Sequence, residues 1–463
     1  MIKNYREPNV YSTVKRRQPR VPATVVDMYP LVIGTGLYQY EQLNQTYESV
    51  TGTSIALTDV TPDDNITGVT VKNSGVEIPA SVALVGTDAK VWTVTLASEV
   101  DGATLDVTVA VGNPGQYKLQ RFTGSDAIEE FYGPKYKDGK INNISLGAQI
   151  AKDSGSTVVY VLQVPTPANG KLLDAYKKAI EDNVVEIPGN PVWRMQPVDN
   201  DKDVQDYIMK FVYDMSTPEE RSEKYYALNN KDAEAKVTVT DVTESFKTAV
   251  TKALADPTEY AAYRYQTFYP NTAVYTVEVD GEEKDIEVGG EFIGAAIAGA
   301  EQALERESQS LTCSTIPAYI FKSLKGVKMR RSEKNALAAL GVTLLVQDEE
   351  NGAITIRDSL SMDVSTEQNA DPCVTRAIDY GSKYVRAQLH PYLGKYNITP
   401  ETLSKIQAAA ASAMHTLVSK KLFVTAEIID IYQNEDDLTN VIINARFGVA
   451  YPLKTIDVNI VCD

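Results

Sequence analysis

The chain has 463 residues, of which 43% are hydrophobic, and its 45 basic and 62 acidic side chains give a formal net charge of −17. This length predicts two to four domains, and the acidic balance argues against nucleic acid as the main partner, because phosphate binding requires a basic surface. Three widely spaced cysteines exclude a disulfide framework or a zinc cluster. No apolar run is long enough to cross a membrane and no secretory signal opens the chain, so we expect assembly in a reducing cytoplasm without membrane insertion.

Residues 1–24 form a basic stretch, punctuated by prolines, that has no apolar surface to fold around. Within residues 1–22, six Lys and Arg side chains stand against one Glu, so this stretch carries a net charge of +5 in a strongly acidic protein. We expect an extended N-terminal arm. A disordered basic tail is the alternative interpretation.

The next segments predict a buried strand followed by a β-domain. The sequence YPLVIGTGLYQY is typical of a buried strand that ends at Gly34 and Gly36. In residues 46–115, short β-rich runs alternate with turn clusters such as TPDDN and EVDG, which is typical of a small sandwich or barrel of about 70 residues. We expect Trp92 to anchor its core.

Beyond the β-domain the pattern becomes α/β. Apolar runs such as STVVYVLQVP alternate with amphipathic runs such as GKLLDAYKKAIED, as in a sheet covered by helices. We expect an α/β (α+β) multidomain fold: helix-covered sheet domains, an inserted small all-β, sandwich-like domain, and extended N- and C-terminal arms. The expected parts are a linking arm at 1–24, a body at 25–45 and 116–325, the inserted domain at 46–115, a C-terminal α/β domain at 326–454 and a linking strand at 455–463.

The last third predicts two long helices and a hairpin. The stretch VTRAIDYGSKYVRAQLHPYLG is amphipathic. One of its faces carries Ile378, Gly381, Val385 and Leu389, and the opposite face carries Asp379, Lys383, Arg386 and His390. Thr399 and Pro400 begin the next helix, FVTAEIIDIY and NVIINARFGVAY form a hairpin, and KTIDVNIVCD alternates as a strand to the last residue.

Catalytic chemistry finds little support in these residues. His390 and His415 are the two histidines of the chain, and neither has a Cys or Ser neighbour arranged as a nucleophile. The GTG after the first strand lacks the third glycine of a dinucleotide loop, and the acidic turns lack the ligand spacing of a calcium loop. We therefore predict no catalytic residues, no cofactor, no metal site and no enzyme activity.

Four stretches, in a fixed order, carry a resemblance to a known family. They are YPLVIGTG continued at FTGSDAIEEFYGPKYKDGKINNISLGAQIAKDSGSTVVYVLQV, then YRYQTFYPNTAVYTVEVDGEEKDIEVGGEFIGAAIAGAEQ, then SEKNALAALGVTLLVQDEENGAITIRDSLSMD, and finally VTRAIDYGSKYVRAQL with the terminal hairpin and its trailing strand. Their order and spacing resemble the tail sheath protein of contractile phage tails and related contractile injection systems. The resemblance implies a structural virion protein that polymerises around an inner tail tube and contracts to drive it through the host envelope.

The resemblance also implies how subunits are linked. In that family the N-terminal arm and the C-terminal strand leave the subunit and complete a small sheet with the terminal hairpins of neighbours. The implied linking residues are Val10, Tyr11, Thr13, Val14, Lys15, Arg16 and Arg17 in the arm, Ile456, Val458, Ile460 and Cys462 in the strand, and Ile428, Ile443, Ala445 and Phe447 in the acceptor hairpin. Residues 425–463 hold seven acidic and two basic side chains, so their net charge of −5 opposes the +5 of the arm.

The implied partners are further copies of the chain, in hexameric rings stacked into a helical sheath, together with the inner tail tube, baseplate and tail terminator proteins. Lys383 and Arg386 become candidates for gripping the tube, against an ordinary solvated helix face. No direct nucleic acid contact is implied, and the expected place is the virion tail after assembly in the host cytoplasm. Two alternatives stay open: an α/β enzyme with an unidentified cofactor, and an adhesion or receptor-binding protein built on the β-domain.

Overall fold

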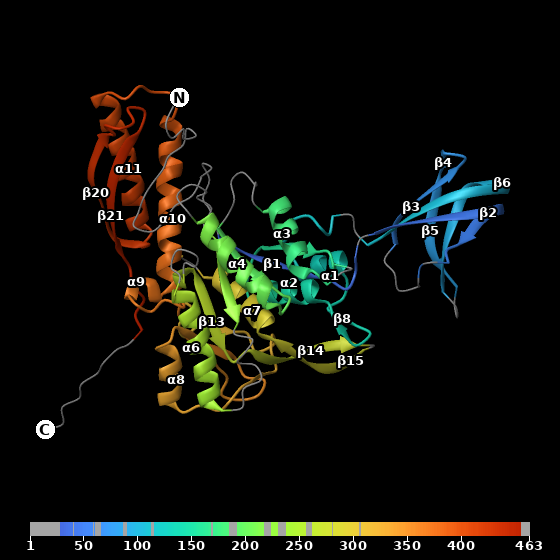
Figure 1. The fold of residues 1–463 in the computed structure, drawn as a ribbon, viewed down its shortest axis with the longest axis horizontal. Coiled ribbons are helices and arrows are strands. Elements are labelled where there is room, and N and C mark those ends of the chain that lie inside the picture. The colour runs from blue at the N-terminus through green and yellow to red at the C-terminus, as the bar shows by residue number, and fades with distance from the viewer. Residues whose placement is uncertain are drawn as a thin grey trace.

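The computed structural model describes residues 28–39, 41–58, 60, 66–86, 90–112, 115–167, 170–184, 192–216, 224–229, 238–255, 262–279, 281–304 and 307–454. In this part of the chain there are three bodies: a central sheet body, an inserted β-domain that projects to one side, and a C-terminal module of two long helices and a hairpin on the other side (Figure 1). The predicted arm at 1–24 and strand at 455–463 lie outside the described residues.

The sheet body is built on a nine-stranded sheet in the order β16-β19-β18-β13-β12-β11-β1-β10-β7. Six neighbouring strands are parallel: β18 (Val342–Val346), β13 (Tyr265–Tyr269), β12 (Lys224–Asn229), β11 (Val192–Pro197), β1 (Met28–Thr35) and β10 (Val159–Val164). The antiparallel strands at the two edges are β16 (Thr315–Ile316), β19 (Ile354–Asp358) and β7 (Gln120–Phe122). The continuous apolar runs of the sequence follow from this arrangement, because helices bury both faces of the sheet.

Alternate residues of β1 enter two different cores. Val32 packs in one core with α1, α2 and α7, whereas Leu31 and Ile33 pack in the other with α3, α4 and α6. The helices are α1 (Ser125–Tyr132), α2 (Asn143–Asp153), α3 (Leu172–Asn183), α4 (Lys202–Met215), α6 (Val239–Ala255) and α7 (Gly290–Gln302). A Cβ on Gly299 would lie 2.0 Å from the carbonyl oxygen of Ala151, so the small residues of α7 are required for its close approach to α2.

Smaller elements border this sheet. They are the three-stranded sheet of β15 (Glu282–Gly289), β14 (Thr272–Val279) and β17 (Ser323–Lys325), the pair β8 (Tyr136–Lys137) and β9 (Lys140–Ile141), and the short helices η1 (Ala262–Arg264), α8 (Arg331–Ala338) and α9 (Glu367–Ala370).

The predicted domain boundary at residue 326 is wrong for the sheet. Thr267 of β13 lies opposite Val342 of β18, so strands beyond residue 326 belong to the sheet body. The C-terminal module consists of α10 (Pro372–Leu389), η2 (His390–Tyr392), α11 (Pro400–Ser419), β20 (Phe423–Gln433) and β21 (Val441–Val449). Sequence patterns could not show that β13 pairs with β18, because parallel partners are far apart along the chain.

The inserted β-domain contains β2 (Glu41–Ala56), β3 (Ile66–Asn73), β4 (Val76–Ile78), β5 (Ala80–Val85) and β6 (Val91–Val111). β6 pairs with β2, β3 and β5, so the described strands form one five-stranded sheet rather than the two sheets of a sandwich. Trp92 lies at the margin of its core. The domain begins before the predicted residue 46, because Glu41 already pairs with Val111.

Candidate assembly interface

The C-terminal module presents a two-stranded sheet. β20 and β21 pair from Phe423 opposite Val449 to Gln433 opposite Val441. Among the residues that the structure describes, no third strand pairs with either of them. A sheet edge that no strand covers can accept a strand from another chain through main-chain hydrogen bonds.

The four residues predicted for the acceptor hairpin share one face. Ile428 lies opposite Ala445, while Phe447 and Ile443 lie opposite Ala426 and Ile431. Cross-strand partners point to the same side of a sheet, so the structure brings the four residues together. Because Phe447 stacks on Phe423 with 4.4 Å between ring centroids, this is the inner face, turned toward α10 and α11. An added strand would therefore meet the edge of the hairpin and not these four side chains.

The outer face of the hairpin carries polar side chains such as Glu427 and Arg446, and two exposed apolar side chains interrupt it because β20 is irregular. Its register shifts between Phe423 and Thr425 and again between Ile428 and Asp430. The extra residues are Val424 and Ile429, which turn outward and are 65% and 58% exposed. A bulge commonly re-aims a side chain in this way. Exposed apolar side chains on one face are typical of a protein interaction surface.

Gly381 holds the hairpin against α10. A Cβ at this position would lie 2.6 Å from the ring of Phe423. We expect Gly381→Val to destabilise the module by about 1–3 kcal/mol, because the added methyl groups overpack this contact. Urea unfolding would measure the change. Gly124→Val is the matched control, since its Cβ would meet no atom within 4 Å; equal stability of the two variants would contradict the packing role of Gly381.

An ion pair fixes the point at which the chain leaves the hairpin. The Lys454 ammonium lies 2.9 Å from Asp371, at the start of α10, and 3.2 Å from Asp358 at the end of β19. Burial lowers the pKa of Lys454, but the two carboxylates outweigh burial and raise it above its ordinary value. The predicted linking strand at 455–463 would therefore begin from a fixed anchor between the C-terminal module and the sheet body.

The predicted tube-gripping face of α10 is not a solvated face. Lys383 and Arg386 are 2% and 1% exposed, and Asp379 is 1% exposed. The alternative of an ordinary solvated helix face is wrong, because α10 packs against the sheet body on one side and against α11 and the hairpin on the other. Contact of Lys383 and Arg386 with an inner tube stays an untested prediction, and it would require this face to become uncovered.

Buried ion pairs join α10 to the sheet body. Arg264 of η1 and Asp379 form two parallel hydrogen bonds of 2.8 and 2.9 Å, with both side chains buried. Glu301 of α7 lies between Arg376 of α10 at 3.6 Å and Arg194 of β11 at 3.3 Å. Bidentate geometry fixes orientation as well as distance, so the Arg264–Asp379 pair orients α10 on the sheet body.

The crevice in which a doubly wound enzyme would bind its cofactor is filled. In the sheet, β1 has β10 on one side and β11 on the other, which makes the carboxyl end of β1 the topological switch point. Asp199 fills this place, accepting hydrogen bonds from the Thr35 main-chain N–H at 2.8 Å, the Tyr176 hydroxyl at 2.7 Å and the Asn143 amide at 2.8 Å. Burial, followed by the charge of Asp199, raises the pKa of Tyr176 well above its ordinary value. These hydrogen bonds tie the ends of β1, α2 and α3 together around Asp199.

The other reactive side chains have structural surroundings. Burial raises the pKa of the Cys373 thiol, which keeps it protonated and unreactive. The Nδ1 atom of His415 lies 3.2 Å from the hydroxyl of Ser419 on the same helix, and this hydroxyl donates a hydrogen bond to the main-chain carbonyl of His415. Within the described ranges, no three His, Cys, Asp or Glu side chains gather as metal ligands would. Nor is any described helix both long and apolar enough to cross a membrane.

Comparisons with known proteins agree with this architecture. No protein-family model matches the sequence, and no curated protein matches it. The structure is similar to that of the helical sheath of the anti-feeding prophage in its contracted state, with a TM-score of 0.56 and 10% sequence identity over 100% of this chain and 98% of that chain. It is also similar to a chain of the baseplate of the same device, with a TM-score of 0.54 and 12% identity over 76% of this chain and 90% of that one. The resemblance stated from the sequence is thus confirmed at the level of fold.

Proposed function

We propose that this chain is a tail sheath subunit, which polymerises around an inner tail tube and contracts to drive the tube through a host envelope. The observation that carries the proposal is the similarity in fold to a contracted sheath over the whole length of both chains. The similarity to a baseplate chain supports a baseplate as a further partner. The filled crevice at the end of β1 gives no support to the alternative of a cofactor-dependent enzyme.

Linkage between subunits would use the hairpin edge. Val10 to Arg17 of one copy and Ile456 to Cys462 of another would add strands to β20–β21 of a third, with the basic arm steered to the acidic C-terminal region. The anchor at Lys454 would keep the donated C-terminal strand at a constant distance from the sheet body. Flexible links between rigid bodies allow the bodies to rotate without dissociating.

Contraction would then be a rearrangement of packed bodies. Energy would be stored in an extended lattice and released as the subunits bury more surface, so no nucleotide would be needed. The proposed partners are other copies in hexameric rings, the inner tube protein and a tail terminator. The proposed place is a virion tail assembled in the host cytoplasm, with genome ejection as the outcome in a bacteriophage.

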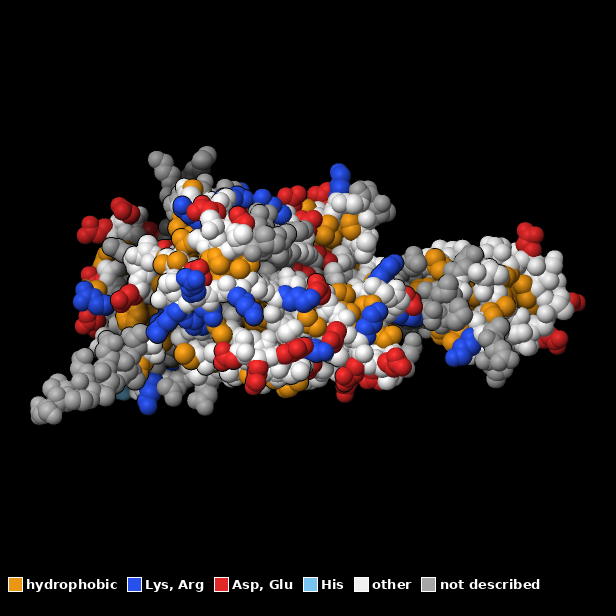
Figure 2. All heavy atoms as spheres, turned by 90° about the horizontal axis from the view of Figure 1, so that it is seen from below, with side chains coloured by type: hydrophobic (Ala, Val, Ile, Leu, Met, Phe, Trp, Pro, Cys, Tyr) orange, Lys and Arg blue, Asp and Glu red, His pale blue; other side chains and the backbone are white. Residues whose placement is uncertain are grey.

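The inserted β-domain would lie on the outside of the sheath. It projects away from the C-terminal module (Figure 1), and acidic side chains lie at its far end (Figure 2). Residues 41–112 hold ten acidic side chains and two lysines, so copies of this domain would repel one another and would not pack in a lattice. Receptor binding by this domain is compatible with such a position.

The direct test is negative-stain electron microscopy of the purified chain at rising salt. Striated hollow tubes would support the sheath proposal, and discrete small particles at every salt concentration would overturn it. Size-exclusion chromatography gives a second readout, because a sheath forms very large, polydisperse polymers.

Substitution of the bulge residues Val424 and Ile429 tests how much the outer face of the hairpin contributes to tube formation. We expect Val424→Lys combined with Ile429→Lys to raise the concentration needed for tube formation roughly 30-fold, since about 2 kcal/mol of apolar burial between copies would be lost. Sedimentation of tubes over a concentration series would measure this. Val76→Lys, at a 70% exposed position of the inserted β-domain, is the matched control. An equal effect of both variants would show that the hairpin surface contributes no more to contacts between copies than another exposed apolar position does.

A further inference from the structure

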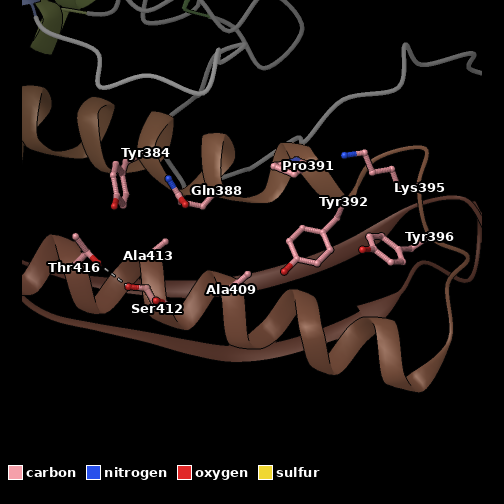
Figure 3. Close-up of a pocket in the computed structure, with 10 residues that line it drawn as sticks. All are labelled: Tyr384, Gln388, Pro391, Tyr392, Lys395, Tyr396, Ala409, Ser412, Ala413 and Thr416. Carbon is pink, nitrogen blue, oxygen red and sulfur yellow. Dashed lines mark hydrogen bonds between the residues drawn. The ribbon is translucent and has the colours of Figure 1, made fainter.

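A groove runs between α10, η2 and α11 at the far end of the C-terminal module. Its volume is about 490 Å³. Tyr384 and Gln388 of α10 form one wall with Tyr392 and Tyr396, and α11 supplies small side chains such as Ala413 as the floor (Figure 3). The groove is open to solvent, and Tyr396 is 53% exposed.

Three of the side chains that line the groove are tyrosines, Tyr384, Tyr392 and Tyr396, and the buried Tyr380 packs behind Tyr384. Tyr380, Tyr384, Gln388, Tyr392 and Tyr396 recur at every fourth position. Tyr380 and Tyr384 stack with ring centroids 6.3 Å apart and planes within 8°, and Tyr392 lies 5.8 Å from Tyr396. These rings are positioned before any ligand arrives.

Lys420 fixes the inner end of this series of residues. Its ammonium lies 3.1 Å from the Tyr380 hydroxyl and 5.4 Å from the Tyr384 ring centroid. The outer end lies near acidic residues. Because α11 runs back along α10 and β20 runs back along α11, the loop with Glu435, Asp436 and Asp437 returns to the end where η2 lies.

This chemistry selects a particular kind of ligand. Tyrosine-lined grooves bind polyproline II segments, whose proline rings pack between the aromatic rings. Tyrosine faces also attract guanidinium groups. The preferred ligand is therefore an extended peptide that contains both proline and arginine.

The chain itself contains such a peptide. Residues 16–22 read RRQPRVP. Polyproline II has three residues per turn, so Arg16, Pro19 and Pro22 would lie along one side of the segment. Pro22 is six residues before Met28, where the described fold begins, so this segment would leave a folded body almost at once.

We propose that the tyrosine-lined groove binds residues 16–22 of a second copy of the chain, with Pro19 and Pro22 between the tyrosine rings and the arginines toward the acidic loop. The proposal rests on the proposed sheath function, in which the arm leaves its own subunit. It adds a second attachment point beside the hairpin edge. The arm would be held by side chains at 16–22 and by main-chain pairing at 10–15.

Cross-linking between two differently marked copies tests the proposal. In full-length protein with Cys313→Ser and Cys462→Ser, one preparation carries Val21→Cys and the other carries Ser412→Cys. A short bismaleimide is added after mixing, and the heterodimer is read on a denaturing gel. Ala411→Cys is the matched control, because Ala411 is exposed on α11 and does not line the groove. We expect a strong heterodimer band with Ser412→Cys and a band at least about tenfold weaker with Ala411→Cys.

Each outcome bears on one proposal or the other. Tubes without the Ser412 cross-link would overturn groove binding and leave the sheath proposal standing. The cross-link without tubes would support groove binding and count against the sheath. One chain can also carry both Val21→Cys and Ser412→Cys. If the cross-link forms within such a chain but never between two chains, the groove binds residues 16–22 of its own chain, and the proposal of a second copy is overturned. Pro19→Ala with Pro22→Ala should lower the heterodimer yield about tenfold, and an unchanged yield would overturn the polyproline mode.

Discussion

Removal of residues 1–20 is expected to leave a folded subunit that no longer forms tubes. The described fold begins at Met28, so the cores around β1 stay complete without the arm. Each copy would lose the strand that it donates to a neighbour's hairpin, and a helical polymer that lacks one link per subunit loses many links per ring. Electron microscopy should show no tubes, and size-exclusion chromatography should show a single small species. Long tubes from the shortened chain would show that the linkage idea is wrong.

A variant with fewer charges separates two roles of the arm, namely strand donation to a neighbour and electrostatic attraction to it. Lys15, Arg16, Arg17 and Arg20 all changed to Gln keep the β-branched alternation of residues 9–14 and remove most of the positive charge. Since complementary charge contributes to the association rate and register more than to affinity, tubes should still form, but more slowly and with less dependence on salt. If this variant fails as completely as the deletion, charge and not strand donation holds the arm.

Local sequence patterns predicted the elements of the fold better than their grouping. The apolar run at Leu31–Ile33 indicated a buried strand, and β1 is one, buried on both faces. The pairing of β13 with β18 joins residues about 75 positions apart in the chain, and no periodicity records such a pairing. For that reason the predicted boundary at 326 divided one continuous sheet.

The candidate interface was predicted in outline and missed in detail. The terminal hairpin was placed correctly, but its two bulges were not predicted, although the adjacent apolar pairs Phe423-Val424 and Ile428-Ile429 break the alternation where they occur. Lys383 and Arg386 were predicted to grip the tube, with a solvated helix face as the alternative, and the burial of both side chains was not foreseen. The spacing of four residues that relates Tyr380, Tyr384, Tyr392 and Tyr396, with Gln388 between them, was a signal in the sequence that could have pointed to the groove.

Asp379→Asn is expected to cause the largest loss of stability among single substitutions in the C-terminal module. The change removes one partner of a bidentate pair in which Arg264 and Asp379 are both buried. A buried arginine without its carboxylate costs about 3–5 kcal/mol. Hydrogen exchange measures the effect locally: amides of α10 should exchange at least about 100-fold faster, which corresponds to roughly 3 kcal/mol. Glu401→Gln, which breaks an exposed pair with Lys405 on α11, is the control and should leave exchange unchanged.

Replacing both Arg264 and Asp379 distinguishes a role of this ion pair in stability from a role in orienting α10. Replacing a buried ion pair by apolar residues of similar size is often neutral for stability, so Arg264→Met with Asp379→Leu should recover most of the protection that Asp379→Asn loses. Geometry should not recover, because apolar contacts do not reproduce the fixed orientation of two parallel hydrogen bonds. If the pair sets the angle at which the hairpin is presented, the double variant will be stable and will form tubes of irregular striation. Stable protein with regular tubes would mean that packing alone orients α10, and an unstable double variant would mean that Arg264 supports the fold through further contacts.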